Sequence, residues 1–168
     1  VETAVDRLMW VKAFNAGQIC TNVDYVFLPE GKEEAFTKEA QRVLAGRYPD
    51  INGQDYTSII DERSYHRLQA TLDDAVAKGA RAVNLFPNQT PDASKRKFPI
   101  TAVFNVTDDM EIMQREIFGP LLPVKTYRTR EEVAAYVNKR DRPLALYPFT
   151  NDRDLQNYYI THIMSGGV

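Results

Sequence analysis

The sequence predicts an α/β domain in which helices cover both faces of a central sheet. Amphipathic helical patterns alternate along the chain with short runs of β-branched and aromatic residues. Some of these runs are apolar at every position instead of every second one, which is typical of strands buried on both faces. At 168 residues the chain fits one domain, and it contains no internal repeat.

The first predicted helix begins at Glu2, and a strand follows over residues 25–28. Apolar side chains recur at helical spacing in the helix, namely Val5, Leu8, Met9 and Phe14. The strand is an unbroken apolar run, Tyr-Val-Phe-Leu. Between the two elements lies a short link that contains Gly17 and the only cysteine of the chain, Cys20.

The middle of the chain predicts two helices, two strands and the loops between them. These are a helix over 31–46 closed by Gly46, a loop over 47–58, a helix capped by Asp61 or Ser64 that ends at Gly79, a strand over 80–86, a polar loop over 87–97 and a strand over 100–106. The buried face of the second helix is predicted to carry Tyr65, Leu68, Leu72, Ala75 and Val76.

The last third of the chain is predicted to continue the alternation of strands and helices. Residues 108–120 have no clear period but are too apolar for a solvated loop. The expected elements after them are a strand over 121–127, a helix to about residue 139 with Thr129 and Glu132 as a capping box, a continuous apolar strand over 144–150, and a helix opened by Asp152.

Composition gives no sign of several classes of partner. The 21 Lys and Arg residues nearly balance the 23 Asp and Glu residues, so charge gives no reason to expect nucleic acid or an anionic membrane. The short basic run at 94–97 is assigned to a solvated loop. One cysteine and two histidines offer no metal-ligand spacing. The single cysteine and the lack of a signal peptide or long apolar run favour a cytoplasmic setting.

Cys20 is the residue with the clearest chemical potential. A lone cysteine is by default a small buried hydrophobe. A thiol is nevertheless a natural nucleophile for carbonyl carbon, because part of it is thiolate near neutral pH. A bend at Gly17 would let the sulfur project, and the backbone amide of Cys20 could stabilise a developing oxyanion. The local signature of papain-like proteases is absent.

Four short motifs occur in order along the chain. Residues 14–22 read Phe-Asn-Ala-Gly-Gln-Ile-Cys-Thr-Asn, and residues 116–120 read Glu-Ile-Phe-Gly-Pro. The first resembles the active-site cysteine signature of the aldehyde dehydrogenase superfamily, and the second resembles the second hallmark of that superfamily. Residues 142–147 and 165–168 are similar to the class-3 and coniferyl aldehyde dehydrogenase branch. The resemblance covers nearly the whole chain and implies the catalytic, C-terminal domain of that family, with a mostly parallel sheet covered by helices.

The resemblance implies a role for three residues. Cys20 matches the nucleophile, which forms a thiohemiacetal with the aldehyde and a thioester after hydride transfer to NAD or NADP. Glu116 matches the residue that binds the nicotinamide ribose hydroxyls, and Phe118 matches the aromatic that packs against the nicotinamide. Asn15 and Gln18 are expected to brace the loop through bonds from side chain to backbone.

The resemblance also implies groups outside residues 1–168. The family's general base glutamate, the asparagine of the oxyanion hole and the cofactor domain would precede Val1, and the oligomerisation tail would follow Val168. The chain itself has neither a G-x-G-x-x-G nor a P-loop motif. We therefore expect a catalytic-domain fragment that is inactive alone, from a parent that forms a homodimer or homotetramer.

Two alternatives stay open at this point. The thioester could be resolved by coenzyme A instead of water, or the domain could be a non-catalytic interaction module with an inert or redox-responsive thiol. Outside their motif, Glu116 would be a surface carboxylate beside Arg115, and Phe118 would be a core aromatic. The substrate is expected to be an aldehyde, and its coniferyl-type aromatic character depends on the resemblance alone.

Overall fold

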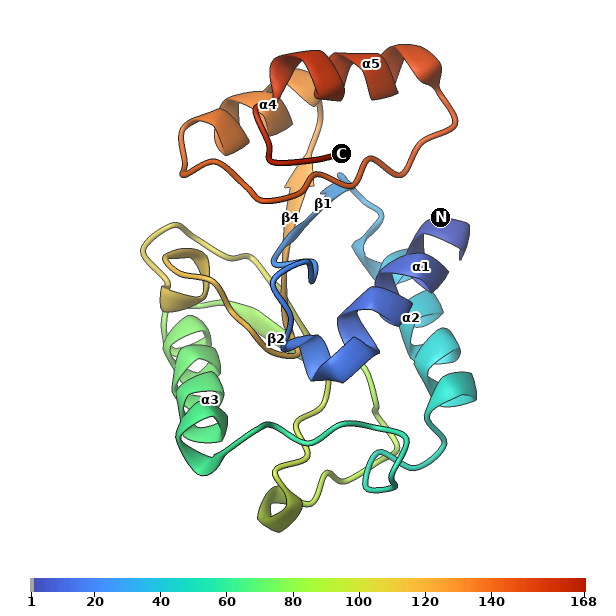
Figure 1. The fold of residues 1–168 in the computed structure, drawn as a ribbon, viewed down its shortest axis with the longest axis vertical. Coiled ribbons are helices and arrows are strands. Elements are labelled where there is room, and N and C mark those ends of the chain that lie inside the picture. The colour runs from blue at the N-terminus through green and yellow to red at the C-terminus, as the bar shows by residue number, and fades with distance from the viewer. Residues whose placement is uncertain (1) are drawn as a thin grey trace.

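The computed structural model describes residues 2–168 and contains one mixed sheet within that range (Figure 1). Its strands are β1 (Val26–Pro29), β2 (Arg81–Asn84), β3 (Thr101–Phe104) and β4 (Leu121–Tyr127), in the order β1-β4-β3-β2. Strand β4 runs parallel to β1 and to β3, whereas β2 pairs with β3 in the antiparallel sense. The predicted α/β class with a mostly parallel sheet is therefore confirmed.

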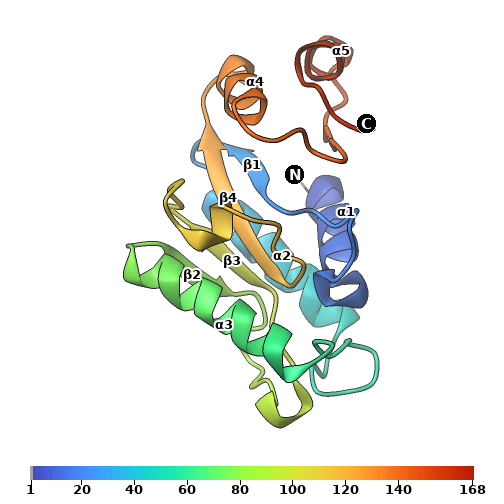
Figure 2. The same ribbon diagram turned by 60° about the vertical axis from the view of Figure 1, so that its left-hand side comes forward.

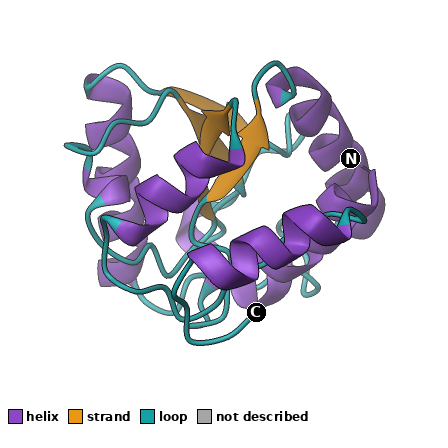
Figure 3. Ribbon diagram, turned by 90° about the horizontal axis from the view of Figure 1, so that it is seen from above, coloured by secondary structure: helices purple, strands orange, loops and turns teal. Residues whose placement is uncertain are grey.

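Helices lie on both faces of the sheet. Helices α1 (Glu2–Ala13) and α2 (Glu33–Arg47) pack together on one side, and α3 (Glu62–Ala77) lies on the other (Figure 2). Seen from above, the strands are at the centre with helices around them (Figure 3). Every residue of β3 is buried, as expected for a strand covered on both faces.

The register of β4 explains how two distant loops come together. The first half of β4 pairs with β3, with Leu121 opposite Thr101, and its second half pairs with β1, with Val124 opposite Val26. Because β1 begins later along β4, the chain that enters β1 lies beside the beginning of β4. The loops that precede these two strands therefore meet at the amino end of the sheet.

The end of the chain forms a smaller lobe beyond the carboxyl end of β4 (Figure 1). Helices α4 (Arg130–Asn138) and α5 (Arg153–His162) enclose a hydrophobic cluster of their own, made of Val133, Ala134, Val137, Tyr159 and Ile163. Both predicted cap residues cap their helices, but the Glu132 side chain of the predicted capping box accepts from the amide of Arg128 at 2.9 Å instead of from that of Thr129. Thr129 Oγ1 accepts from the amide of Glu132 at 3.3 Å, and Asp152 accepts from the amides of residues 154 and 155.

The predicted strand over 144–150 is wrong. The segment is irregular, and its bridge between Ala145 and Gly167 is an isolated one. Pro148 lacks an N–H group and interrupts any ladder within the run. Leu144 and Tyr147 are exposed instead of buried. Apolar composition alone was a misleading signal here, because these side chains line a surface and not the core.

Smaller differences concern helix ends and one irregular segment. Gly46 lies within α2 instead of ending it, and Asp61, not Ser64, caps α3 by accepting from the amide of Ser64 at 2.7 Å. Val76 is exposed, not on the buried face of α3. The aperiodic stretch 108–120 is apolar because Met110, Ile112, Met113 and Ile117 are buried in an irregular loop. Among the described residues, no helix combines the length and apolarity needed to cross a bilayer.

Candidate active site

Residues 14–25, which join α1 to β1 and carry Cys20, form a loop that we call the cysteine loop. This loop bends sharply after α1. Its 3-10 turn, Phe14–Gly17, contains three residues with positive φ, namely Asn15 (51°), Ala16 (51°) and Gly17 (74°). Such angles are uncommon for residues that carry a Cβ atom. Cys20 follows this turn and is exposed to solvent. The default expectation of a buried thiol therefore does not hold for Cys20.

Side chains of the loop fix its backbone, as expected from the sequence. Asn15 Nδ2 donates to the carbonyl of Gln18 at 2.9 Å, and Gln18 Nε2 donates to the carbonyls of Asn15 and Ser58. Gln18 Oε1 accepts from the amide of Ile60 at 2.9 Å. Gln18 thus connects the cysteine loop to the segment that contains Ser58 and Ile60. Both the nitrogen and the oxygen of its side-chain amide form hydrogen bonds.

Glu116 and Phe118 lie on the loop that enters β4, and both side chains are exposed. Phe118 has a left-handed backbone (φ 48°) and 44% exposure, which is unusual for a large aromatic residue. Ile117 between them is buried and anchors the loop. Arg67 Nη2 on α3 donates to the carbonyl of Phe118 at 3.4 Å. Arg115 pairs with Glu111 at 3.2 Å, so the expected neighbour of Glu116 has another partner.

The two loops touch through two glycines. A Cβ atom at Gly17 would lie 2.3 Å from the carbonyl oxygen of Gly119 and 2.7 Å from Asn22 Nδ2. A Cβ atom at Gly119 would lie 2.5 Å from the side chain of Leu68 on α3. Neither position has space for a larger residue. The structure therefore brings the loop of Cys20 into backbone contact with the loop of Glu116 and Phe118.

Two polar residues, the buried Lys12 and the half-buried Asp24, strengthen this contact. Asp24 Oδ1 accepts from the amide of Ile117 at 2.9 Å and thereby ties the chain after Cys20 to the opposite loop. Lys12 is fully buried and its Nζ donates to the carbonyl of Val23 at 2.9 Å. Sequence reasoning missed both residues. The position of Lys12 on the apolar face of α1, four residues after Leu8, was the available signal.

Burial shifts the ionisation of this pair toward the neutral forms. Burial lowers the pKa of Lys12 to about 7, with the carboxylate of Asp24 opposing the shift. Burial also raises the pKa of Asp24, whereas the hydrogen bond from the amide of Ile117 and the charge of Lys12 act to lower it. Neutral Lys12 can still donate to Val23, so its hydrogen bond does not depend on its charge.

The free energy of unfolding of the unchanged protein is expected to rise with pH, and Lys12→Met is expected to lack this rise. The pKa of Lys12 is about 7 in the folded protein and ordinarily 10.5, so the unfolded chain binds more protons between these values. The free energy of unfolding should therefore increase with pH across this window, by up to about 1.4 kcal/mol per pH unit. Urea unfolding at several pH values measures the slope. Lys38→Met, at an exposed position of α2, is the matched control. Equal slopes in Lys12→Met and the unchanged protein would contradict this expectation.

An apolar cavity opens beside Cys20. It has a volume of about 290 Å³, and Ile19 and Thr21, the neighbours of Cys20, form part of its wall. We call it the aromatic groove. Its remaining lining is mainly aromatic and comes from α1, the cysteine loop and the segment before α5: Trp10, Val11, Phe14, Val23, Tyr147 and Phe149. The rings of Trp10 and Phe14 stack with centroids 5.8 Å apart. Sequence reasoning missed this groove because it assigned residues 144–150 to a buried strand.

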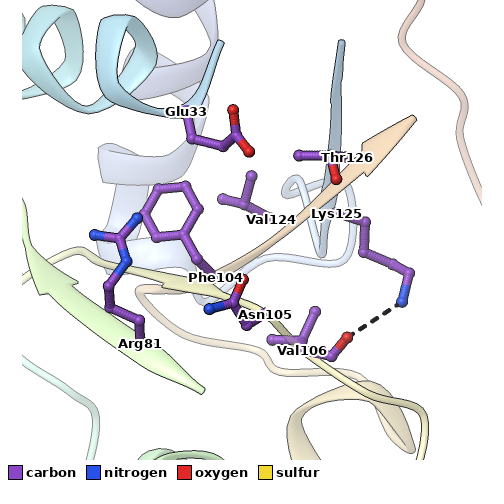
Figure 4. A pocket seen from close by; sticks show the side chains of 8 residues that line it. All are labelled: Glu33, Arg81, Phe104, Asn105, Val106, Val124, Lys125 and Thr126. Carbon is purple, nitrogen blue, oxygen red and sulfur yellow. Dashed lines mark hydrogen bonds between the residues drawn. The ribbon is translucent and has the colours of Figure 1, made fainter. Parts of the chain in front are cut away.

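A second cavity lies at the other end of the sheet, where β3 ends and β4 continues (Figure 4). Its volume is about 210 Å³, and its lining residues are Glu33, Arg81, Phe104, Asn105, Val106, Val124, Lys125 and Thr126. Lys125 Nζ points out of it toward the carbonyl of Val106, 3.4 Å away (Figure 4). This cavity contains none of the candidate site residues. Within residues 2–168, no three His, Cys, Asp or Glu side chains gather as they would around a metal ion.

Comparisons with known proteins agree with the motifs. The aldehyde dehydrogenase family matches residues 1–168. The chain is 46% identical to a probable coniferyl aldehyde dehydrogenase of Caulobacter vibrioides, over 99% of this chain and 35% of that protein. It is 44% identical to the coniferyl aldehyde dehydrogenase of a Pseudomonas species, over 96% of this chain and 34% of that protein.

A solved structure of AldH from Staphylococcus aureus, in a substrate-bound state, is similar to this fold. Its TM-score is 0.88 at 31% identity, over 99% of this chain and 35% of that one. The chain thus spans about a third of the length of the relatives it matches. The family match extends over every residue, and the resemblance drawn from the four motifs is confirmed. The chain belongs to the aldehyde dehydrogenase family.

Proposed function

We propose that residues 1–168 are the catalytic domain of an enzyme that oxidises an aldehyde to a carboxylic acid with NAD or NADP. The observation that carries this proposal is the backbone contact between Gly17 and Gly119. That contact unites an exposed thiol with an exposed carboxylate and an exposed aromatic ring. The cofactor domain and the oligomerisation tail are assigned to the remaining length of the enzyme, and the active form to a homodimer or homotetramer.

Cys20 acts as the nucleophile in this proposal. Its thiolate sulfur attacks the carbonyl carbon and forms a C–S bond, and the carbonyl oxygen becomes an oxyanion that the backbone amide of Cys20 stabilises. When bound, NAD or NADP would supply the chemistry of hydride transfer from this carbon, which leaves a thioester on Cys20, and Glu116 and Phe118 would hold its nicotinamide end. Water then cleaves the thioester and releases the acid and the free thiol. The general base and a second oxyanion donor come from outside this chain, so the chain alone is expected to be inactive.

Glu116 and Phe118 fit the nicotinamide end of the cofactor. An exposed carboxylate can accept hydrogen bonds from both hydroxyls of a ribose. The exposed ring of Phe118 offers a flat apolar surface to the nicotinamide, and buried Ile117 holds the two residues in place. Asp24 further fixes this loop at the amide of Ile117, 2.9 Å from its carboxylate oxygen. The loop can therefore hold the nicotinamide at a constant distance from the cysteine loop.

The aromatic groove supports an aromatic aldehyde as the substrate. Its rings can stack against a conjugated ring whose aldehyde carbon points toward Cys20. Two of the relatives bear coniferyl aldehyde dehydrogenase in their names, and that substrate carries such a ring. A coniferyl-type aldehyde is accordingly the substrate class that we propose.

The test uses the enzyme that contains this chain together with its cofactor domain. We expect reduced cofactor to form with coniferyl-type aldehydes at a kcat/KM about fivefold above that for short aliphatic aldehydes, since aromatic stacking contributes roughly 1 kcal/mol. Product analysis with and without coenzyme A completes the experiment. A strict coenzyme A requirement would favour acyl transfer, and the absence of any cofactor reduction would favour a non-catalytic module.

A further inference from the structure

Tyr147 links the C-terminal lobe to the turn that carries the nucleophile. Its hydroxyl donates to the carbonyl of Thr21 at 3.0 Å, one residue after Cys20. The same side chain lines the aromatic groove. Tyr147 belongs to the irregular segment between α4 and α5, which runs along the side of the lobe that faces the rest of the protein (Figure 1).

The segment that carries Tyr147 is held to the lobe through its backbone, while the Tyr147 side chain itself is partly exposed. On the lobe side, the isolated bridge between Ala145 and Gly167 includes the hydrogen bond from the amide of Leu146 to the carbonyl of Gly167, at 2.9 Å. The amide of Gly166 also donates to the carbonyl of Pro143 at 2.9 Å, and Leu146 packs against the cluster of the lobe. Tyr147 itself is 45% exposed. It is therefore not fixed by burial, and its hydroxyl supplies the directional contact with the cysteine loop.

The turn around Cys20 is anchored on its other side by Asn22. The amide of Asn22 closes the turn by donating to the carbonyl of Ile19 at 3.0 Å, and its Nδ2 donates to the carbonyl of Gly17 at 2.9 Å. Asn22 Oδ1 is buried without a hydrogen-bond partner in the described part of the chain. Asn22 thus holds the turn toward Gly17, while the opposite carbonyl, that of Thr21, is held by Tyr147.

We propose that Tyr147 is a positioning residue that orients the nucleophile relative to the aromatic substrate. Its hydroxyl fixes the peptide that follows Cys20, and its ring forms the wall against which the substrate lies. One side chain therefore sets the positions of both the sulfur and the aldehyde carbon. Rates of attack are sensitive to such alignment, since a displacement of about 1 Å can cost a hundredfold. This inference depends on the proposed role of Cys20 as nucleophile.

The variant Tyr147→Phe separates the two contributions of the side chain. It keeps the ring in the groove and removes the hydrogen bond to Thr21. Binding of an aromatic ligand should therefore persist while alignment is lost. Because both partners are exposed, the carbonyl of Thr21 can bind water in the variant, and folding should be unaffected.

The first measurement needs no cofactor and uses the chain itself. Cys20 is alkylated with N-benzyl iodoacetamide, whose ring can enter the aromatic groove, and the labelling rate is measured against reagent concentration. We expect Tyr147→Phe to lower the maximal labelling rate about fivefold, the factor that corresponds to one neutral hydrogen bond, and to leave the half-saturating concentration unchanged. In the complete enzyme kcat should fall by a similar factor at constant KM.

Tyr158→Phe is the matched control. Tyr158 lies on α5, away from the groove. Its ring stacks on that of His162 with centroids 4.1 Å apart, and Arg130 Cζ lies 4.2 Å from its centroid. This variant should label and turn over like the unchanged protein. The proposal is overturned if Tyr147→Phe retains the full maximal rate, if only its half-saturating concentration changes, or if Tyr158→Phe shows the same loss. The proposed function is tested separately, because full aldehyde oxidation by a protein without Cys20 would contradict it.

Discussion

Replacing Cys20 with alanine is expected to reduce aldehyde oxidation by roughly a thousandfold or more, because no covalent intermediate can form without the sulfur. Cys20 is the only cysteine in the chain, so no neighbouring thiol of this domain can take its place. The measurement is the steady-state rate of cofactor reduction in the complete enzyme. Cys20→Ser, which keeps the shape but offers a much weaker nucleophile, should lose activity to a comparable degree.

Stability distinguishes this loss from unfolding. Since Cys20 is exposed, its replacement should change the free energy of unfolding by no more than about 0.5 kcal/mol. Urea unfolding of the chain with and without Cys20→Ala tests this. Full activity in Cys20→Ala would end the proposed mechanism, whereas a large loss of stability would show that the thiol also has a structural part.

Gly17→Ala is expected to damage both stability and catalysis. Its Cβ atom would lie 2.3 Å from the carbonyl oxygen of Gly119, and the residue has a φ of 74°. The new methyl group must push the two loops apart, and positive φ adds strain. We expect a loss of at least about 2 kcal/mol in the free energy of unfolding. A displacement of the loops by about 1 Å should lower kcat about a hundredfold.

The measurement that identifies the cause is the KM for the cofactor. Separation of the loops moves Glu116 and Phe118 away from Cys20, so this KM should rise together with the loss of kcat. Gly31→Ala provides the control, because Gly31 has a φ of 79° but no atom within 4 Å of its Cβ position. It should show the backbone strain of about 1 kcal/mol without the catalytic loss. Equal catalytic losses in both variants would contradict the role of the contact.

Local signals in the sequence were sufficient for much of the fold. The strand over 121–127 has the predicted bounds, because its apolar run ends where Arg128 and Thr129 begin a helix cap. The caps themselves depend on neighbouring residues only, so they can be predicted without the rest of the protein. The motifs around Cys20 and Glu116 likewise pointed to the two loops that the structure brings into contact.

Features that depend on long-range contacts could not be predicted. Lys12 falls on the apolar face of α1, but nothing in the sequence shows that the carbonyl of Val23 lies close enough to accept a hydrogen bond from it. The hydrogen bond from Ile117 to Asp24 joins residues that are close only after the sheet has formed. The segment 144–150 has the composition of a core strand. Its exposure follows from the position of the lobe, which no local pattern encodes.

The lobe formed by α4 and α5 has a hydrophobic cluster separate from the main core, and this division would limit the robustness of the substrate recognition proposed above. Two rings of the aromatic groove, Tyr147 and Phe149, come from the segment that joins the helices of this lobe, whereas Trp10 and Phe14 are anchored to the larger body. Small clusters open with lower free energy than large ones. Warming or mild denaturant should therefore erase the proposed preference for aromatic aldehydes before it disorders the loop of Cys20, so selectivity is expected to be the more fragile of the two properties.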